Sequence, residues 1–428
     1  MKILGIIFCN IQMVHMFHLG QTEGKPSRPF YSLSLETDLR TELFETNQYS
    51  PLQRPVLRVT TNVSLTILTV NELNIKDQYL SISGYLTIAW EDNRLSWNNP
   101  SKTSQDYTNV VYLFSAAKYL WTPTIIIENS VDDVSTMADT NIPLRITSDG
   151  AVYWSLSGIF KVACESDIRY YPLDSQTCII RITTWGYTQG EILLQLDEDK
   201  PINFDYYNQN GEWELHSSSA YYASNRYERG LSFSTLYFQM TFKRKPLFHI
   251  INTIFPVVLM AFLIPMVYKL PSESGEKMGY CLTVLLAYAV YMSIISDNIP
   301  STSKSVCFLS IYLGLTLAFS TISVNLVILT LYAYFQGETA APTWILTIIR
   351  RKRRCDAEEN KIVPCLNEEN GNIIDGKVME ITQTPEAKTL TYHDLSLMLD
   401  KFFFMVYMIA ITLSTLTLLI VLLTNYHA

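Results

Sequence analysis

The sequence is poor in the residues from which catalytic and metal centres are usually built. It contains 6 His and 7 Cys among 428 residues, and the histidines are scattered along the chain. No metal-ligand spacing and no nucleophile motif is present among them. We therefore expect a protein that is not an enzyme and that holds no metal and no cofactor.

Basic residues are also few. The chain has 32 Lys+Arg against 40 Asp+Glu, a formal net charge of -8. Proteins that bind nucleic acid normally present a basic surface, so we expect no nucleic-acid partner. Hydrophobic residues make up 48% of the chain, and after residue 246 they are segregated into four long runs.

The four apolar runs are long enough to cross a membrane as helices. A helix rises about 1.5 Å per residue and the hydrocarbon layer is about 30 Å thick, so about 20 residues suffice. Pro256 and Pro265 in the first run predict a kink, which is tolerated where neighbouring groups or water satisfy the carbonyls that proline leaves free. We expect membrane helices at residues 247–268, 278–296, 306–335 and 401–424.

The segments around these helices predict their orientation. Residues 1–24 begin with Lys2 and a largely apolar stretch, which is typical of a secretory signal peptide. Four spans after a cleaved signal place both ends of the chain, including residues 425–428, outside the cell. Residues 336–400 then form a cytoplasmic loop, disordered at first and later helical up to the last span. The basic residues 350–354 in this loop fit the positive-inside rule, and the predicted location is the plasma membrane, in contact with lipid.

Residues 25–245 show the alternation of a β-protein. Apolar side chains between Leu80 and Trp90 recur at every second position, so they point to one side of a strand. Similar strands are expected at residues 144–156, 178–185, 191–196 and 233–242. Many short strands separated by turns predict an immunoglobulin-like β-sandwich.

Two smaller features belong to the same domain. Leu35, Leu39 and Leu43 recur at four-residue steps and predict a short amphipathic helix that begins at Ser34. Asn62 lies in a glycosylation sequon that proline does not block, and we expect it to be glycosylated; an unmodified surface strand is the alternative.

The second apolar run carries a stripe of polar and small residues bracketed by carboxylates. Steps of three and four residues place the stripe on one helical face. Carboxylates at a membrane are costly unless they face water. Several copies of such a helix around an axis would form a cation pore with two acidic rings and a hydrophobic gate, whereas the alternative is a helix packed against its neighbours. The stripe comprises Glu276, Gly279, Thr283, Leu286, Val290, Ser293 or Ile294, and Asp297, with Leu286 and Val290 as the gate.

The second run and the loop after it resemble a known family. They read GEKMGYCLTVLL from Gly275 and IPSTS from Ile299. They resemble the corresponding parts of the pentameric Cys-loop receptors, which are ligand-gated ion channels, and are closest to the nicotinic acetylcholine receptor subunits. The resemblance covers most of the chain and is weakest before Leu52 and between Gln336 and Leu399.

The resemblance implies an architecture and an activity. It implies an extracellular sandwich followed by a four-helix transmembrane bundle, assembled as a homo- or heteropentamer that a small-molecule agonist opens. The Gly275-Glu276-Lys277 motif goes with selectivity for cations, and we expect monovalent cations to permeate. The alternatives are an anion-selective member of the family and a non-conducting four-span receptor or assembly subunit.

The family's disulfide loop is matched by Cys164 and Cys178, which the resemblance pairs. Within this loop Tyr171, Pro172 and Asp174 resemble the tip that couples agonist binding to the pore, and a cis bond before Pro172 is expected. The resemblance implies contact between this tip and three further residues, although one of them, Arg244, could alternatively be an anchor at the membrane interface. The three residues are Arg244, Ile299 and Pro300.

The resemblance also implies an aromatic box for a cationic or amine agonist at the subunit interface. Trp185 matches its central tryptophan, and Glu128 stands where the family has a tyrosine. The hairpin from Tyr221 to Phe233, which the resemblance places over this box, lacks the adjacent cysteine pair found in acetylcholine-binding relatives, so acetylcholine is not predicted as the agonist. Glu128 is expected to pair with a cationic ligand, or else the site has drifted from agonist binding. The predicted ligand-binding residues are Trp185, Phe233, Tyr221, Tyr222 or Tyr227, Glu128 and, from the opposite face, Tyr85.

Overall fold

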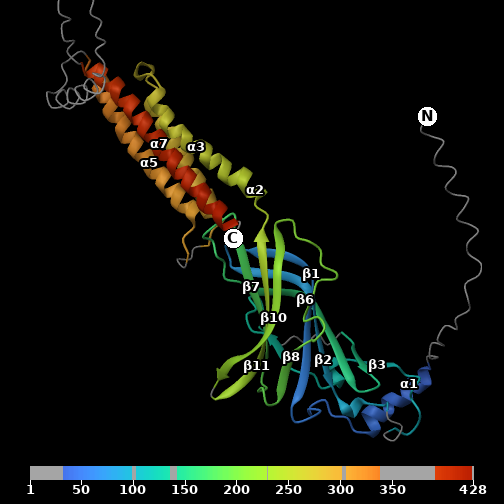
Figure 1. The fold of residues 1–428 in the computed structure, drawn as a ribbon. Helices are drawn as coiled ribbons and strands as arrows, with labels where there is room; N and C mark the ends of the chain where they lie inside the picture. The colour runs from blue at the N-terminus through green and yellow to red at the C-terminus, as the bar shows by residue number, and fades with distance from the viewer. Residues whose placement is uncertain are drawn as a thin grey trace, which may run out of the picture.

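The computed structural model describes residues 32–98, 103–134, 142–228, 230–300, 305–337 and 391–426, with the backbone alone at 224–228 and 425–426. Within these ranges the chain forms a β-sandwich and a helical bundle joined end to end (Figure 1). The predicted signal peptide, the basic cluster and most of the predicted cytoplasmic loop lie outside the described residues.

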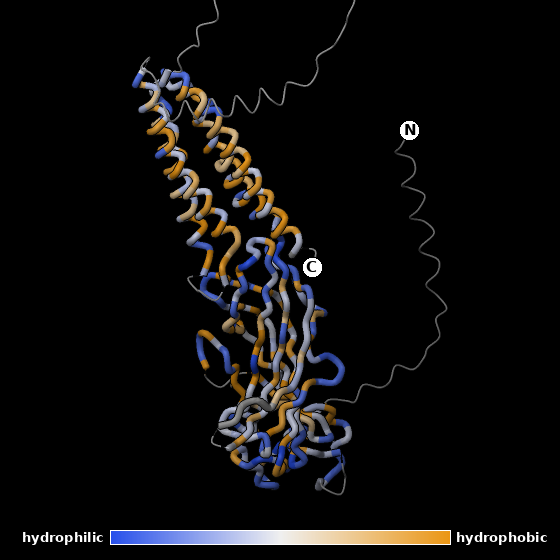
Figure 2. Tube along the Cα trace, turned by 60° about the vertical axis from the view of Figure 1, so that its left-hand side comes forward, coloured by the Kyte–Doolittle hydropathy of each residue, from blue (hydrophilic) through white to orange (hydrophobic). Residues whose placement is uncertain are grey.

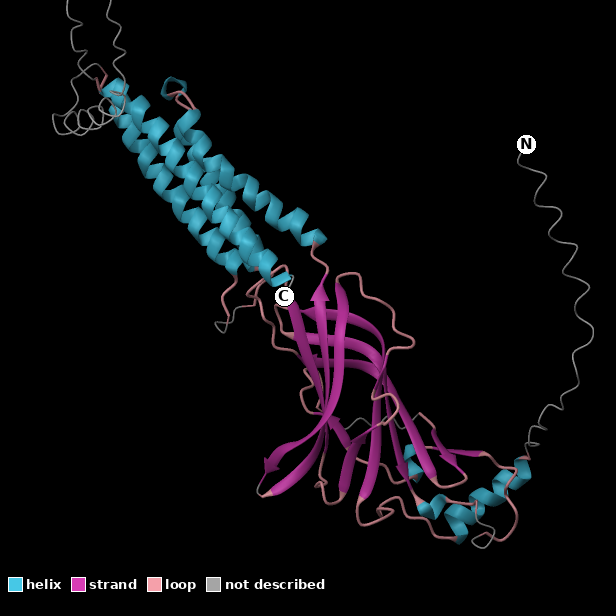
Figure 3. Ribbon diagram, in the orientation of Figure 1, coloured by secondary structure: helices cyan, strands magenta, loops and turns pink. Residues whose placement is uncertain are grey.

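Two sheets form the sandwich (Figure 3). The larger has the order β3-β5-β6-β2-β1-β8, with β9 beside β1, and the smaller has the order β10-β11-β7-β4. The strands of the larger sheet are β1 (Val59–Asn74), β2 (Tyr79–Glu91), β3 (Tyr112–Ser115), β5 (Leu144–Thr147), β6 (Ala151–Ala163), β8 (Ile192–Leu196) and β9 (Ile202–Asn203). Those of the smaller sheet are β4 (Ile125–Ile127), β7 (Ser175–Thr184), β10 (Trp213–Glu228) and β11 (Leu231–Arg244).

The predicted alternation places the core of the sandwich on one side of β2. Leu80, Ile82 and Ile88 are completely buried there. Each such side chain contributes about 1.5–3 kcal/mol when it leaves water. Gly84 interrupts the series because a Cβ at this position would lie 2.2 Å from the carbonyl oxygen of Thr66 on the neighbouring strand.

The prediction of one continuous strand at residues 144–156 is wrong. The structure divides it into β5 and β6, with a tight turn in which the Gly150 N–H donates to the Thr147 carbonyl at 2.9 Å. Gly150 has a φ of +92°, a conformation that residues with a Cβ rarely adopt. The apolar alternation is the same before and after the turn, so the alternation alone does not reveal that the strand ends there.

The predicted amphipathic helix exists, but it begins earlier than Ser34. Helix α1 (Leu33–Arg40) is capped by Ser32, whose hydroxyl accepts the Leu35 N–H at 3.4 Å. The chain then continues as a π-helical turn at Thr41–Thr46. Leu39 and Leu43 are buried against the sandwich, so the apolar face was identified correctly and the cap was not.

Four helical segments are long and apolar enough to cross a membrane. Figure 2 shows their apolar residues as orange stretches along the bundle. The first combines α2 (Leu247–His249), a π-helical segment (Ile250–Ile254), α3 (Phe255–Met266) and a 3-10 turn (Val267–Lys269). The others are α4 (Lys277–Ser296), α5 (Phe308–Phe335) and α7 (Tyr392–Tyr426), so the prediction that helix continues into the last span is confirmed.

Tyrosines of α4 tie it to the first span. Pro256 has no N–H, so the carbonyl of Asn252, four residues earlier, lacks its helical partner. The hydroxyl of Tyr291 donates to that carbonyl at 2.5 Å, and Tyr288 donates to the Val257 carbonyl at 3.0 Å. A neighbouring helix therefore satisfies the backbone that proline leaves free, as the sequence predicts.

The ends of the helices show how the chain crosses the bundle. The first span starts where β11 ends, and α7 ends beside the same junction (Figure 1). The start of α7 lies at the far end of the bundle, near the end of α5, where the His393 N–H donates to the Gly337 carbonyl at 3.3 Å. The four spans run along the bundle in alternating directions, so the end of α7 returns to the end of the bundle that carries the sandwich.

Candidate functional site

The disulfide loop lies at the junction of sandwich and bundle. Cys164 and Cys178 are bonded, with an S–S distance of 2.02 Å and Cα atoms 5.0 Å apart, as the resemblance implies. The bond between Tyr171 and Pro172 is cis. Tyr171 and Asp174 at the tip of the loop are both buried. The loop therefore points its polar tip into the protein.

A buried ion pair anchors this tip to the last strand of the sandwich. Arg244, the final residue of β11, donates through Nε to Asp174 Oδ1 at 2.8 Å, and both side chains are about 97% buried or more. Gln176 Nε2 donates to the other carboxylate oxygen at 2.6 Å. The guanidinium also lies over the ring of Trp213, 4.1 Å from its centroid. Arg244 is thus enclosed by protein, which contradicts its alternative role as an anchor at the membrane interface.

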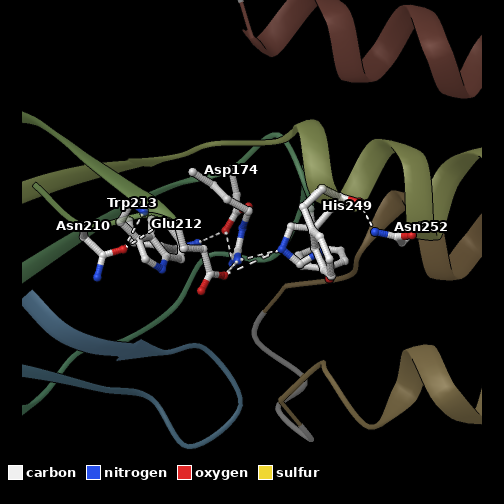
Figure 4. Close-up of polar contacts among 10 residues, drawn as sticks. Asp174, Asn210, Glu212, Trp213, His249 and Asn252 are labelled. Atoms are coloured by element: carbon white, nitrogen blue, oxygen red, sulfur yellow. Dashed lines mark hydrogen bonds and ion pairs between the residues drawn. The ribbon is translucent and has the colours of Figure 1, made fainter.

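A second carboxylate continues the network toward the membrane helices. Glu212 Oε1 accepts from Arg244 Nη1 at 2.5 Å and lies 3.6 Å from His249 Nε2 at the end of α2. The other ring nitrogen of His249 is 3.2 Å from the Tyr171 hydroxyl. Figure 4 shows Asp174, Glu212 and His249 pointing toward one another across the junction. The network therefore joins the disulfide loop, β10, β11 and the first membrane span.

The electrostatics of the network favour an ionised Glu212. The nearby imidazole of His249 and the positive charge of Arg244 hold the pKa of Glu212 below its ordinary value, against partial burial, which raises it. At 3.6 Å the contact with His249 is longer than a good hydrogen bond, so Arg244 is the firmer partner. Burial raises the pKa of Tyr171, which therefore stays neutral as a hydrogen-bonding group.

Acid is expected to weaken this junction through Glu212. Because its pKa is lowered in the folded protein, ionised Glu212 stabilises the fold above its ordinary value of 4.5, and this contribution is lost as the pH falls through the lowered value. Thermal unfolding of the purified protein should therefore show a smaller acid-induced loss for Glu212→Gln than for the wild type. Glu214→Gln, which alters an exposed carboxylate two residues further along the chain, is the control and should follow the wild type. Equal losses in all three proteins would contradict the assignment.

The loop between α4 and α5 is placed only in part. Ile299 packs partly buried against the core and Pro300 is buried, whereas residues 301–304 lie outside the described chain. The disulfide loop contacts the start of α5: the Arg169 carbonyl accepts the Phe308 N–H at 3.1 Å, and the rings of Tyr170 and Phe308 are 5.4 Å apart. Sequence reasoning did not identify this contact.

Helix α4 has two chemically different faces. Its buried face includes Lys277, Val284 and Tyr288. The predicted stripe is the other face, and every member of it is exposed in the single chain, with Leu286 at 66% and Val290 at 53%. Helix α7 exposes mainly long apolar side chains, among them Ile409, Leu413, Leu416 and Ile420, with Thr412 and Thr417 also exposed.

Most of the predicted ligand residues lie on the smaller sheet. Trp185 directly follows β7 and is 51% exposed. Tyr221 and Tyr222 on β10 are each 40% exposed, and Tyr221 stacks on Tyr237 with ring centroids 5.1 Å apart. Phe233 lies on the adjacent β11, where its backbone is paired with that of Arg226.

Four further predicted positions lie on the sandwich. Glu128 follows β4 on the same sheet, and its N–H donates to the Arg181 carbonyl at 2.8 Å. Tyr85 is half-buried on β2 of the larger sheet, whereas Trp185 follows β7 of the smaller one. Tyr227 pairs through its backbone with Ser232, and its side chain lies outside the described part. Asn62, the predicted glycosylation site, is exposed on β1.

Sequence reasoning missed Glu212, Trp213 and His249. Trp213 lies opposite Arg244 in the β10–β11 pair. That pairing contains two register shifts, and without the register nothing marks Glu212 as a neighbour of Arg244. Across the described ranges, no group of three or more His, Cys, Asp or Glu is arranged to hold a metal ion.

Comparison with known proteins agrees with this geometry. Residues 36–246 match the neurotransmitter-gated ion-channel ligand binding domain, and residues 253–361 match the neurotransmitter-gated ion-channel transmembrane region. The boundary between the two matches falls at the junction where the sandwich meets the bundle.

Individual relatives are acetylcholine receptor subunits. The chain is 33% identical to acetylcholine receptor subunit delta of Xenopus laevis over 72% of this chain and 61% of the relative. It is 31% identical to neuronal acetylcholine receptor subunit alpha-3 of Bos taurus over 73% and 63%. It is 28% identical to neuronal acetylcholine receptor subunit beta-2 of Gallus gallus over 75% and 65%. The matches thus span less than two thirds of the length of these relatives.

Proposed function

Because the chain belongs to the neurotransmitter-gated ion-channel family of Cys-loop receptors, we propose that it is a subunit of a pentameric channel that a small cationic or amine agonist opens to monovalent cations. The protein is a multi-pass plasma-membrane protein with its sandwich outside the cell. A closed ring requires that each copy contact the next head to tail. Both the agonist site and the pore are therefore assembled from more than one subunit.

The exposed face of α4 is the observation that carries the proposal. A helix in the lipid-facing layer would be expected to expose mainly long apolar side chains, and α7 does so from Phe402 to Leu423, with Thr412 and Thr417 as uncharged exceptions. The stripe of α4 instead exposes Gly279, Thr283 and Ser293 between Glu276 and Asp297. Polar and charged groups inside a membrane are costly unless they face water or protein. A shared water-filled axis meets that requirement for every copy at once.

The order of residues along this face supports selection and gating of cations. Rings of Glu276 and Asp297 at the two mouths would concentrate cations and repel anions, because the surrounding protein and lipid have a low dielectric constant. Leu286 and Val290 lie between them and would form a constriction that excludes water when the pore is closed. Gly279 leaves the section near Glu276 wider than a hydroxylic side chain would.

The agonist site proposed here lies between two sandwiches. Trp185 and Tyr222 expose aromatic surface on the smaller sheet, and the faces of such rings attract cations. Tyr85 lies on the other sheet, so a neighbouring subunit would supply it. Glu128 adds a carboxylate on the Trp185 side, which favours a protonated amine or a quaternary ammonium group.

The disulfide loop provides the connection between the two sites. Asp174 and Arg244 link the loop rigidly to β11, the strand that leads both from the agonist hairpin and into the first membrane span. Movement of the hairpin on agonist binding would therefore be passed to α2 and α5 and would bias a two-state pore.

Cysteine labelling tests whether the stripe faces water. We expect Thr283→Cys to react with a hydrophilic thiol reagent applied from the cytoplasmic side, because Thr283 lies between Glu276 and the proposed constriction at Leu286 and is reached without passing it. Val284→Cys, which is next in sequence but faces the bundle, should be protected and serves as the matched control. Labelling is read by capture of the modified protein, so the test does not depend on an agonist or on a subunit that conducts alone.

The same experiment distinguishes the proposal from its alternatives. Protection of both cysteines would place the stripe against protein or lipid and would overturn the pore assignment. If Thr283→Cys is labelled, the reversal potential in diluted sodium chloride separates a cation channel from an anion channel.

A further inference from the structure

Lys277 is a completely buried cation at the start of α4. Its Nζ lies 2.6 Å from Asp400 Oδ2 on α7 and 3.4 Å from Ser272 Oγ, to which it donates. Asp400 is itself only 6% exposed. The pair spans 123 positions of the sequence and lies at the end of the bundle away from the sandwich. Helix α7 thereby reaches the base of α4, although it packs chiefly against α3 and α5.

The position of this lysine matters because it directly follows Glu276. The Glu276 carboxylate is exposed at the N-terminus of α4, where the helix dipole also favours a negative charge. An ammonium group at the same mouth would oppose its field. In the structure Lys277 turns to the bundle side of the helix and meets a carboxylate there.

We propose that Asp400 is a positioning residue for ion selection: it holds and neutralises Lys277 inside the bundle, so that Glu276 sets the charge at this mouth of the pore. The two carboxylates and one ammonium leave a net charge of -1 per subunit, whereas loss of Asp400 would leave none. The inference rests on the proposed cation channel and adds to it a determinant on α7, outside the helix that carries the pore stripe.

The burial of Lys277 and Asp400 determines how strongly the two charges interact. Exposed ion pairs are screened by salt and contribute little. Lys277 and Asp400 are shielded from water, so each needs the other, and a lysine that loses its partner is driven to find solvent. If the stripe lines the pore, the water next to Lys277 is at the mouth that carries Glu276.

Asp400→Asn is the direct test. We expect at least roughly a twofold lower single-channel sodium conductance at low ionic strength, because the uncompensated ammonium opposes the field of Glu276. The reversal potential should shift toward that of chloride, and both effects should shrink as salt is added. Lys401→Gln alters an exposed charge next to Asp400 and is the control that should leave conductance unchanged.

Rescue separates an electrostatic role from a structural one. Asp400→Glu keeps the charge and should conduct like the wild type. The double variant Lys277→Gln with Asp400→Asn removes both charges and should restore the conductance that Asp400→Asn loses. A wild-type conductance and reversal potential in Asp400→Asn, or a double variant no better than Asp400→Asn, would overturn the inference.

A second measurement covers the case in which Asp400→Asn fails to reach the surface. Lys277→Cys should be protected from a hydrophilic thiol reagent applied to the cytoplasmic face, whereas Gly279→Cys on the exposed stripe should react. Equal reactivity would overturn the inference. Wild-type receptors that conduct no cations would instead contradict the proposed function. Failure of the inference and failure of the proposed function can therefore be distinguished.

Discussion

Receptors that carry Leu286→Ser are expected to conduct in the absence of agonist. Leu286 is 66% exposed in the single chain, so a closed constriction would remove much of this surface from water. Full burial of a leucine is worth about 1.5–3 kcal/mol, and a loss of about 1 kcal/mol in each of five subunits sums to about 5 kcal/mol. That is close to the about 5.5 kcal/mol that moves a two-state equilibrium from 1:99 to 99:1.

The measurement is the resting current in a voltage clamp, divided by the amount of protein at the cell surface. Leu413→Ser is the matched control, because Leu413 on α7 is 64% exposed but does not belong to the predicted pore stripe of α4. We expect a large resting current from Leu286→Ser and none from Leu413→Ser. An unchanged resting current in Leu286→Ser at equal surface expression would count against this face of α4 as the gate.

Removal of Asp174 is expected to have the second large effect. Asp174→Ala leaves the guanidinium of Arg244 buried without its main partner, and breaking a buried pair in this way costs about 3–5 kcal/mol. The loop tip would then lose its rigid link to β11. We expect the current evoked by activating amines to disappear, while surface protein remains detectable by biotin labelling.

The combination of the two variants locates the defect. A receptor with both Leu286→Ser and Asp174→Ala should keep its resting current, because its pore is intact, but should no longer respond to agonist. Asp167→Ala is the control in the same loop, since its ion pair with Arg169 is largely exposed and worth about 0–1 kcal/mol. Agonist responses in Asp174→Ala equal to those of Asp167→Ala would end the coupling role.

The membrane helices could be predicted closely because their signal is local. A run of apolar residues of sufficient length can be identified without knowing its neighbours, and α4 begins within one residue of the predicted start. The two faces of α4 could also be predicted, because helical periodicity alone assigns Thr283 and Val284 to different sides. Whether the exposed face meets water is decided by the assembly and awaits the labelling experiment.

Errors arose where a local pattern continued through a change of backbone direction. The alternation from Leu144 to Leu156 is the same on both sides of Gly150, so periodicity did not reveal the turn. At the first helix, Ser32 and Ser34 are both suitable caps, and it is the Ser32 hydroxyl that accepts the Leu35 N–H. These boundaries depend on tertiary contacts that a short window of sequence does not contain.

The two-domain plan, the spans and the polar face of α4 can be predicted from the amino-acid sequence, because periodicity and length express them within a few turns or strands. The charge partners become visible only in the folded chain. Arg244 meets Asp174 across 70 positions, and Lys277 meets Asp400 across 123. Buried charges must be paired, but a sequence does not say which of its carboxylates will be brought within reach. That choice follows from strand register and helix packing, which are properties of the whole fold.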